Sequence, residues 1–184
     1  YNKVRFRILR RNVALTDPTD RGKKRTDLLK KIRRIMLAIN QIDGIYYLVS
    51  KKTGLGENEL ALLYAIADGG LHSQKEISAH WLIPKTTVNT IIHKYKEEGL
   101  VFLESIEGRR REMNIRLTEK GQALCQEILE PIYDCETAAL KKTLSLHGSA
   151  FIKAFDDFSS LLENEFIENM ITDEDGKFDG FIEK

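Results

Sequence analysis

Two short helices in close succession, followed by two strand-like runs, constrain the fold of this chain more than any other feature of its sequence. Ser73 and Glu76 have the spacing of a capping box, in which the serine hydroxyl and the glutamate carboxylate bind the first free amides of a helix. Pro84 stands where the first turn of the next helix is expected, and Gly99 marks the end of that helix. These signals predict two short helices joined by a tight turn over residues 73–98.

Two runs with strand character follow the second helix. Residues 100–106 form the first run, and residues 113–117, in which apolar residues alternate with polar ones, form the second. The segment 107–112 between them contains a glycine and three arginines and is typical of a turn, so the two runs predict a β-hairpin. Two short helices and a hairpin together predict a winged helix-turn-helix, a unit that places its second helix in the major groove of DNA.

A long amphipathic helix is predicted before this unit. In residues 26–51 apolar side chains recur every three or four positions, with Thr26 as the expected N-cap and Gly54 near the end. Residues 57–67 predict a second, shorter helix. The apolar stripe of the first helix is longer than one small domain usually buries, which suggests packing against a helix of another chain.

Two more helices are predicted after the hairpin. Thr118 is expected to cap a long helix that reaches about Leu144, with a kink at Pro131. A last helix starts at Ser149 and carries a second long apolar stripe, made of Phe151, Phe155, Phe158, Leu162, Phe166 and Met170. The predicted fold class is therefore mainly α, with a small β-hairpin wing and long helices on both sides of the winged helix-turn-helix.

The net charge of +1 conceals a strong polarity along the chain. Residues 1–52 carry a net charge of +11, residues 53–121 a net charge of −1 and residues 122–184 a net charge of −9. A basic N-terminal third indicates an acidic partner such as nucleic acid or a membrane surface. The alternative is a solvated basic helix that pairs with the acidic C-terminal segment.

The helix predicted after Pro84 has one apolar and one polar face. Val88, Ile91, Ile92 and Tyr95 are expected to point inward. The side chains expected to point outward or along the edges are Lys85, Thr86, Thr87, Asn89, Thr90, His93 and Lys94. No acidic residue occurs between Lys85 and Lys96, whereas a plain solvated helix face normally mixes glutamate with lysine. Short hydroxyl and amide side chains read base edges and lysine pairs with phosphate or guanine, so this face is predicted to contact DNA.

Two further groups are predicted to contact the DNA backbone. Arg109, Arg110 and Arg111 are adjacent in the hairpin turn, and three neighbouring guanidiniums favour a phosphate-rich partner and insertion into a narrow minor groove. Ser73 and Gln74 open the first of the two short helices, whose amides can bind a phosphate. For Ser73 a purely local cap is an equally good interpretation, and for the arginines the alternative is a solubilising loop offset by nearby glutamates.

These segments resemble the MarR family of winged-helix transcription regulators over residues 57–121, and the flanking helices extend the resemblance to residues 26–170. The residues that carry it are Ser73–Ser78, Pro84–Asn89, Glu97–Val101, Arg109–Arg111 and Ile115–Gly121. The Leu-Thr-Glu-Lys-Gly close after an arginine-rich wing is the most specific of these. One departure is that Arg109 stands where the family usually has an aspartate that positions a following arginine, here Arg111.

The resemblance implies an obligate homodimer formed by the first and last helices, with two recognition helices about one DNA turn apart on a pseudo-palindrome. The expected parts are a basic extension of unknown role (1–25), an N-terminal dimerisation helix (26–56), the winged helix-turn-helix (57–118), C-terminal dimerisation helices (119–171) and an acidic tail (172–184). Members of the family often bind a small anionic or aromatic effector, while others sense cysteine oxidation or a metal. The sequence leaves the effector open, although Tyr46, Tyr47 and Trp81 are candidates to line an aromatic pocket or are simply core.

Little in the chain indicates other chemistry. Cys125 and Cys135 lie ten residues apart on one predicted helix, too far apart to form a disulfide with each other within it. They are expected to be buried core thiols, with a cross-chain disulfide as the alternative. His72, His80, His93 and His147 are scattered without metal-ligand spacing, so no metal and no cofactor are predicted. No phosphate-binding glycine loop, zinc-protease motif or nucleophile turn occurs, so an enzyme is not expected. No apolar stretch reaches membrane-spanning length, no signal peptide is visible and cysteine is sparse, so a cytoplasmic protein is expected.

The sequence thus predicts a homodimeric, sequence-specific regulator of transcription that binds double-stranded DNA, with repression as the expected mode. The alternative is a winged helix that serves protein contacts without reading DNA sequence. That alternative requires exposed apolar or aromatic anchors on the second short helix, where the sequence instead has polar and basic residues.

Overall fold

The computed structural model describes residues 20–106 and 109–171 and divides the chain into two compact units, residues 1–49 and 50–184. The described residues of the first unit all belong to α1, which runs from Asp20 to Thr53. The predicted extension 1–25 lies outside the described residues up to residue 19, as does the predicted acidic tail 172–184.

The first helix begins six residues earlier than predicted, and Thr26 is not its N-cap. The Thr26 hydroxyl donates a hydrogen bond to the Gly22 carbonyl oxygen at 2.9 Å, which is the bond that a threonine inside a helix makes to the preceding turn. Asp27 and Lys31 form an ion pair of 2.6 Å one turn apart. Apolar residues of the predicted stripe, among them Leu28, Ile32 and Ile42, are exposed in the single chain.

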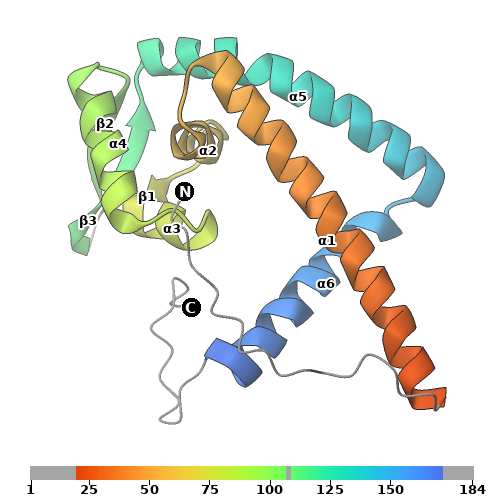
Figure 1. Cartoon of the computed structure of the whole chain (residues 1–184). Helices are drawn as coiled ribbons and strands as arrows, with labels where there is room; N and C mark the ends of the chain where they lie inside the picture. The colour runs from red at the N-terminus through yellow and green to blue at the C-terminus, as the bar shows by residue number, and fades with distance from the viewer. Residues whose placement is uncertain (1–19, 107–108, 172–184) are drawn as a thin grey trace. The chain divides into compact units, whose positions relative to one another are not determined.

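The second unit contains the predicted order of elements and one additional strand (Figure 1). Its elements are α2 (Glu57–Ile66), β1 (His72–Ser73), α3 (Gln74–His80), α4 (Lys85–Glu97), β2 (Val101–Ile106), β3 (Arg109–Leu117), α5 (Glu119–His147), α6 (Ala150–Phe166) and the π-helical turn η1 (Ile167–Ile171). The predicted fold class is confirmed, because the winged helix-turn-helix of α2 to β3 is followed by the long helices α5 and α6.

The core of this unit lies where α2, α3, α4 and α5 meet the sheet. Its most deeply buried apolar side chains are Leu62, Leu63, Ile77, Val88, Ile92, Tyr95, Ile115 and Leu129. In α4 the buried side chains form one stripe, so its polar face is left for solvent or a ligand, whereas α2 buries residues around most of its circumference.

The sheet has three antiparallel strands in the order β1-β3-β2. In the hairpin, Val101 pairs with Leu117 and Ser105 with Met113, and the register shifts between Ser105 and Ile106. The turn predicted at 107–112 is shorter than expected, because β3 already starts at Arg109. The register shift lets Ile106 pair with Arg109, so the three arginines belong to the strand rather than the turn.

Trp81 departs from the predicted apolar side of the first short helix, because 41% of its surface is exposed while Ile77 is buried. It is the C-cap residue of α3, and the backbone turns sharply after it. Leu82 has a positive φ of 51°, a conformation that L-residues rarely adopt, and its side chain is exposed. The turn between α3 and α4 therefore displays two apolar side chains.

The C-terminal helices keep their predicted limits closely. Thr118 caps α5 by accepting a hydrogen bond from the Gly121 amide at 3.0 Å, and α5 continues through Pro131 to Gly148, which has a φ of +68°. The described residues of α6 include none that is buried. Over the described ranges, every helix is too short or too polar to span a membrane.

Candidate nucleic-acid interface

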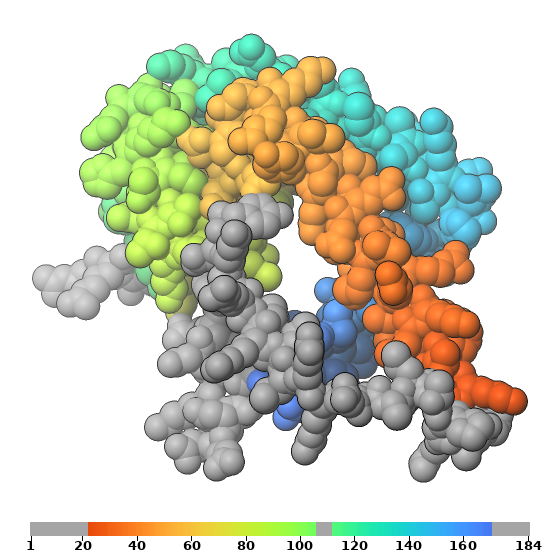
Figure 2. Space-filling view, viewed as in Figure 1, coloured from red at the N-terminus to blue at the C-terminus, as the bar shows by residue number. Residues whose placement is uncertain are grey.

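The position of α4 follows from its sequence. Pro84 is the N-cap residue, one position before the predicted first turn, and Gly99 ends the helix with a φ of +69°. Val88, Ile91, Ile92 and Tyr95 are buried as predicted. Because these four side chains hold the inner face, the opposite face of α4 is turned outward, and Figure 2 shows the atoms of α3 and α4, coloured green, at the surface of the second unit.

The turn between α3 and α4 is held by a buried serine. The Ser78 hydroxyl donates to the Ile83 carbonyl oxygen at 2.7 Å, and 2% of Ser78 is exposed. A buried hydroxyl without a partner is costly, so this bond favours one geometry of the turn. Sequence reasoning missed Ser78, because a serine inside a short helix carries no local signal.

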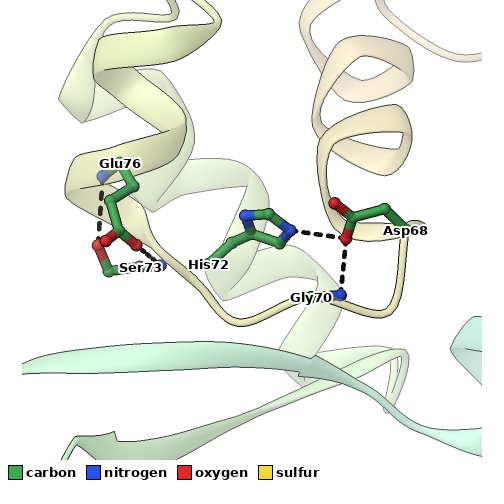
Figure 3. Close-up of polar contacts among 5 residues, drawn as sticks. All are labelled: Asp68, Gly70, His72, Ser73 and Glu76. Atoms are coloured by element: carbon green, nitrogen blue, oxygen red, sulfur yellow. Dashed lines mark hydrogen bonds and ion pairs between the residues drawn. The ribbon is translucent and has the colours of Figure 1, made fainter.

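The entry to α3 is fixed by the predicted capping box, which Figure 3 shows. The Glu76 amide donates to the Ser73 hydroxyl at 3.2 Å, and the Ser73 amide donates to the Glu76 carboxylate at 2.8 Å. This local hydrogen bond and the burial of Ser73 support the interpretation of its side chain as a local cap. Gln74, the next residue, is half-buried.

A second polar cluster precedes this cap (Figure 3). Asp68 Oδ1 accepts a hydrogen bond from the Gly70 amide at 2.7 Å and lies 2.7 Å from His72 Nε2. The hydrogen bonds from His72 and from Gly70 hold the pKa of the Asp68 carboxyl below its usual value. The cluster closes the connection between α2 and β1 and so sets the path of the chain into α3.

The outer face of α4 presents the predicted polar side chains, and one of them, Lys94, is bound by a neighbouring helix. Lys85, Thr86, Asn89, Thr90 and His93 are exposed, and Thr87 is half-buried. The Thr90 hydroxyl donates to the Thr86 carbonyl oxygen at 2.9 Å, which leaves its oxygen as an acceptor. Lys94 is exposed but is ion-paired with Glu59 of α2 at 2.6 Å.

The wing is described only in part. Arg109, Arg110 and Arg111 lie in β3, but their side chains fall outside the described part of the chain. At the other end of the hairpin, Arg116 and Glu104 form an ion pair of 3.0 Å across the strands. The contribution of the three arginines therefore stays a prediction from the sequence.

The start of α5 is fastened to the end of α4. The Thr118 hydroxyl donates to the Gly99 carbonyl oxygen at 2.7 Å, the Thr118 amide to Leu100 O at 3.0 Å, and Lys120 Nζ to Glu98 O at 2.8 Å. These bonds join the end of the outward-facing helix, the start of the hairpin and the first turn of α5.

Tyr95 predicts an unusual substitution effect. Its ring is buried, yet its hydroxyl has no hydrogen-bond partner among the described residues, and burial is the main reason why its pKa is raised. We expect Tyr95→Phe to leave the free energy of unfolding unchanged or to raise it by about 1 kcal/mol, because it removes an unsatisfied polar atom.

Urea denaturation measures this effect. Tyr64→Phe is the matched control, because the Tyr64 hydroxyl donates to the Glu136 carboxylate at 2.6 Å and its removal is expected to cost about 1–2 kcal/mol. A loss of stability from Tyr95→Phe as large as that from Tyr64→Phe would mean that the Tyr95 hydroxyl has a partner.

The remaining candidates behave differently from one another. Cys125 is buried and burial raises the pKa of its thiol to about 11, whereas Cys135 is exposed, so the prediction of two buried thiols is wrong for Cys135. Tyr46, Tyr47 and Trp81 are each exposed rather than core, and Trp81 contacts Tyr64 with ring centroids 5.5 Å apart. In the described ranges, no group of three or more histidine, cysteine or acidic side chains could hold a metal ion.

The helix pair, its turn and the hairpin define a winged helix-turn-helix protein whose second helix turns a polar face outward. Residues 53–112 match the sequence model of the MarR family. The winged-helix segment of this chain thus matches the MarR family, and the resemblance stated from the sequence is confirmed. No curated protein matches the chain by sequence.

Solved structures with the same fold extend this likeness beyond the winged helix. A MarR family regulator from Neisseria meningitidis is similar with a TM-score of 0.59 and 24% identity, over 76% of this chain and 98% of that one. A MarR family regulator from Listeria monocytogenes complexed with 26mer DNA has a TM-score of 0.56 and 19% identity, over 81% and 97% of the two chains. NadR in complex with 4-hydroxyphenylacetate has a TM-score of 0.56 and 16% identity, over 70% and 88%. These likenesses concern the fold, including the long helices beside the winged helix.

Proposed function

We propose that this protein is a sequence-specific transcription regulator that binds double-stranded DNA as a homodimer in the cytoplasm, and that it acts as a repressor. The observation that carries the proposal is the outer face of α4, where Lys85, Asn89 and His93 form an exposed stripe free of acidic residues. Amide, hydroxyl and basic side chains at this spacing suit base edges in the major groove. The Listeria regulator of the same fold was solved with DNA, which supports this use of the fold.

The homodimer is proposed from the apolar faces of the long helices. On α6, Phe151, Ile152, Phe155 and Leu161 are exposed in the single chain. An apolar face of this length is normally covered in a stable protein, and a second copy of the same helix is the simplest cover. Two copies would present two α4 helices to a pseudo-palindromic site.

A small aromatic or anionic effector that releases the DNA is part of the proposal. The likeness to NadR, which was solved with 4-hydroxyphenylacetate, supports a ligand of this class. The only tryptophan of the chain, Trp81, lies in the turn before α4 in contact with Tyr64, so its fluorescence would report on a ligand that moves this turn.

Selection of DNA from a random pool by the purified chain, at two salt concentrations, tests the proposal. We expect an inverted repeat with half-sites about ten base pairs apart. Failure to enrich any sequence, with weak binding that disappears on adding salt, would contradict it. The second candidate function, protein contact, is favoured by exposed Trp81 and Leu82 beside α4, and would then take precedence.

Asn89→Ala tests base reading by α4. Asn89 is exposed in the middle of the outer face, and an amide that binds adenine on two atoms contributes about 1–3 kcal/mol of discrimination. We expect the affinity for the selected site to fall by this amount, with little change for random DNA, in fluorescence anisotropy titrations. An equal loss on both DNAs would exclude Asn89 from base reading.

Arg111→Ala tests the wing. If the arginine contacts phosphate or the minor groove, its removal weakens binding to all sequences alike and reduces the slope of log affinity against log salt by about one. Titrations at four or more salt concentrations measure the slope. An unchanged slope and affinity would show that Arg111 does not contact DNA.

A further inference from the structure

One carboxylate joins the start of α2 to the C-terminal part of α4. Glu59 lies in the first turn of α2, and its Oε2 accepts a hydrogen bond from the Gly56 amide at 2.9 Å. Its Oε1 accepts a hydrogen bond from Lys94 Nζ, near the end of α4, at 2.6 Å. Residues 35 positions apart are thus connected through a single side chain.

The surroundings of this ion pair differ from those of a plain surface pair. The ion pairs Lys31–Asp27 and Lys153–Asp157 each lie within one helix, where they act on that helix alone. Lys94–Glu59 instead joins two helices, and 19% of the Glu59 side chain is exposed. Because the Gly56 amide also holds the carboxylate, Glu59 is oriented toward α4 before Lys94 reaches it.

Both partners of the pair are charged at neutral pH. Burial alone raises the pKa of the Glu59 carboxyl, but the hydrogen bonds from Lys94 and Gly56 outweigh it, so that the pKa is lowered. The hydrogen bond to Glu59 raises the pKa of Lys94. A DNA phosphate that approached Lys94 would meet an ammonium already neutralised, with a carboxylate 2.6 Å from it.

We propose that Lys94 is a positioning residue for DNA reading rather than a phosphate ligand, because Glu59 holds its ammonium and thereby fixes the pose of α4 on α2. This inference rests on the proposed function and corrects it for one residue of the predicted contact set. The buried stripe of α4 holds its inner face, and the ion pair adds a polar anchor at its C-terminal end. The N-terminal part of the outer face, with Lys85 and Asn89, is then presented at a fixed angle.

The two roles of Lys94 predict opposite results for Glu59→Gln. Glutamine keeps an oxygen for the Gly56 amide but loses the charge that holds Lys94. If Lys94 positions α4, Glu59→Gln weakens binding to the selected site. If Lys94 binds phosphate, the same change frees its ammonium and removes a repelling carboxylate, so binding becomes tighter.

The experiment measures the affinity of the full chain for its selected site and for random DNA, over a range of salt, for Glu59→Gln, Lys94→Gln and the double variant. We expect each single change to weaken specific binding roughly fivefold, which is the size of one moderately exposed ion pair. The double variant should be no weaker than either single one, since both remove the same interaction. The salt slope should stay that of the unchanged chain, and Lys153→Gln on α6 is the matched control, with no expected effect.

The following results would overturn the inference. Tighter binding by Glu59→Gln, or a slope reduced by about one in Lys94→Gln, would make Lys94 a phosphate ligand. A lower melting temperature with unchanged affinities would make the pair purely structural. If the unchanged chain binds no DNA sequence specifically, the proposed function fails and this inference fails with it, whereas specific binding that both variants retain in full overturns the inference alone.

Discussion

Gly121→Ala is expected to destabilise this protein more than a methyl group added at any of the other glycines whose surroundings the structure describes. A Cβ at position 121 would lie 2.0 Å from the Leu100 carbonyl oxygen and 3.0 Å from its carbon. Neither atom belongs to a flexible side chain, so relief requires a backbone shift. The Leu100 carbonyl accepts a hydrogen bond from the Thr118 amide, and the Leu100 amide donates to Tyr95 O at 2.8 Å, so the shift would disturb both the start of α5 and the end of α4.

The expected loss in free energy of unfolding is about 3 kcal/mol or more, the upper end for overpacking a tight contact. Urea denaturation followed by circular dichroism measures it. Gly44→Ala is the matched control, because Gly44 also lies in a helix but, apart from its chain neighbours and the backbone of its own helix, no described atom lies within 4 Å of the added Cβ. The control is expected to gain about 0.5–1 kcal/mol from helix propensity. A change at Gly121 within about 0.5 kcal/mol of zero would mean that the contact with Leu100 is looser than described.

Short-range patterns explain why the winged helix could be predicted from the sequence. The capping box at Ser73 and the glycine after α4 are short-range patterns that are confirmed at their positions, whereas Pro84 is the N-cap residue of α4, one position before the predicted first turn. The buried stripe of α4 follows from the helical period alone. Patterns of this kind depend only on neighbours along the chain, so they can be recognised in the sequence alone.

Features that depend on distant partners were not predictable in the same way. The strand β1 has two residues, and its pairing of His72 with Ile115 spans more than forty positions of the chain. The arginines were assigned to a turn because glycine and charge suggested one, whereas the register of β3 against β2 extends the strand to Arg109. The early start of α1 shows that a good N-cap residue does not stop a helix whose preceding turn is also helical.

In the candidate interface, too, the features set by neighbours along the chain were predictable, and the features set by distant partners were not. The exposure of Lys85, Asn89 and His93 follows from the helical period and was predicted. The pairing of Lys94 with Glu59 was not, because the helix alone leaves Lys94 on the edge of the polar face, and only the packing of α2 on α4 brings the carboxylate to it. The same holds for Ser78, whose role depends on where the turn places Ile83.

Phe155→Asp is expected to abolish dimerisation and with it tight DNA binding. Phe155 is 47% exposed in the single chain, and its ring stacks on that of Phe151 with centroids 6.4 Å apart. In a monomer an aspartate at this exposed position costs little. In the proposed dimer the position is covered, and an unpaired carboxylate there costs several kcal/mol, more than most interfaces tolerate.

Light scattering with size-exclusion chromatography measures the assembly, and titration with DNA carrying one or two half-sites measures binding. The unchanged chain should be a dimer, and Phe155→Asp a folded monomer by circular dichroism. Affinity for two half-sites should fall by about a hundredfold or more, while affinity for one half-site stays the same. The reason is that the two winged helices are no longer linked, although each one is intact. Lys153→Gln lies on the opposite side of α6 and should leave the assembly and both affinities unchanged.

A Phe155→Asp chain that remains a dimer with full affinity would place the dimer interface elsewhere, whereas an unchanged chain that is itself a monomer would remove the homodimer from the proposal. Equal losses of affinity for DNA with one and with two half-sites would mean that α6 supports the fold of the winged helix rather than joining two copies of the chain.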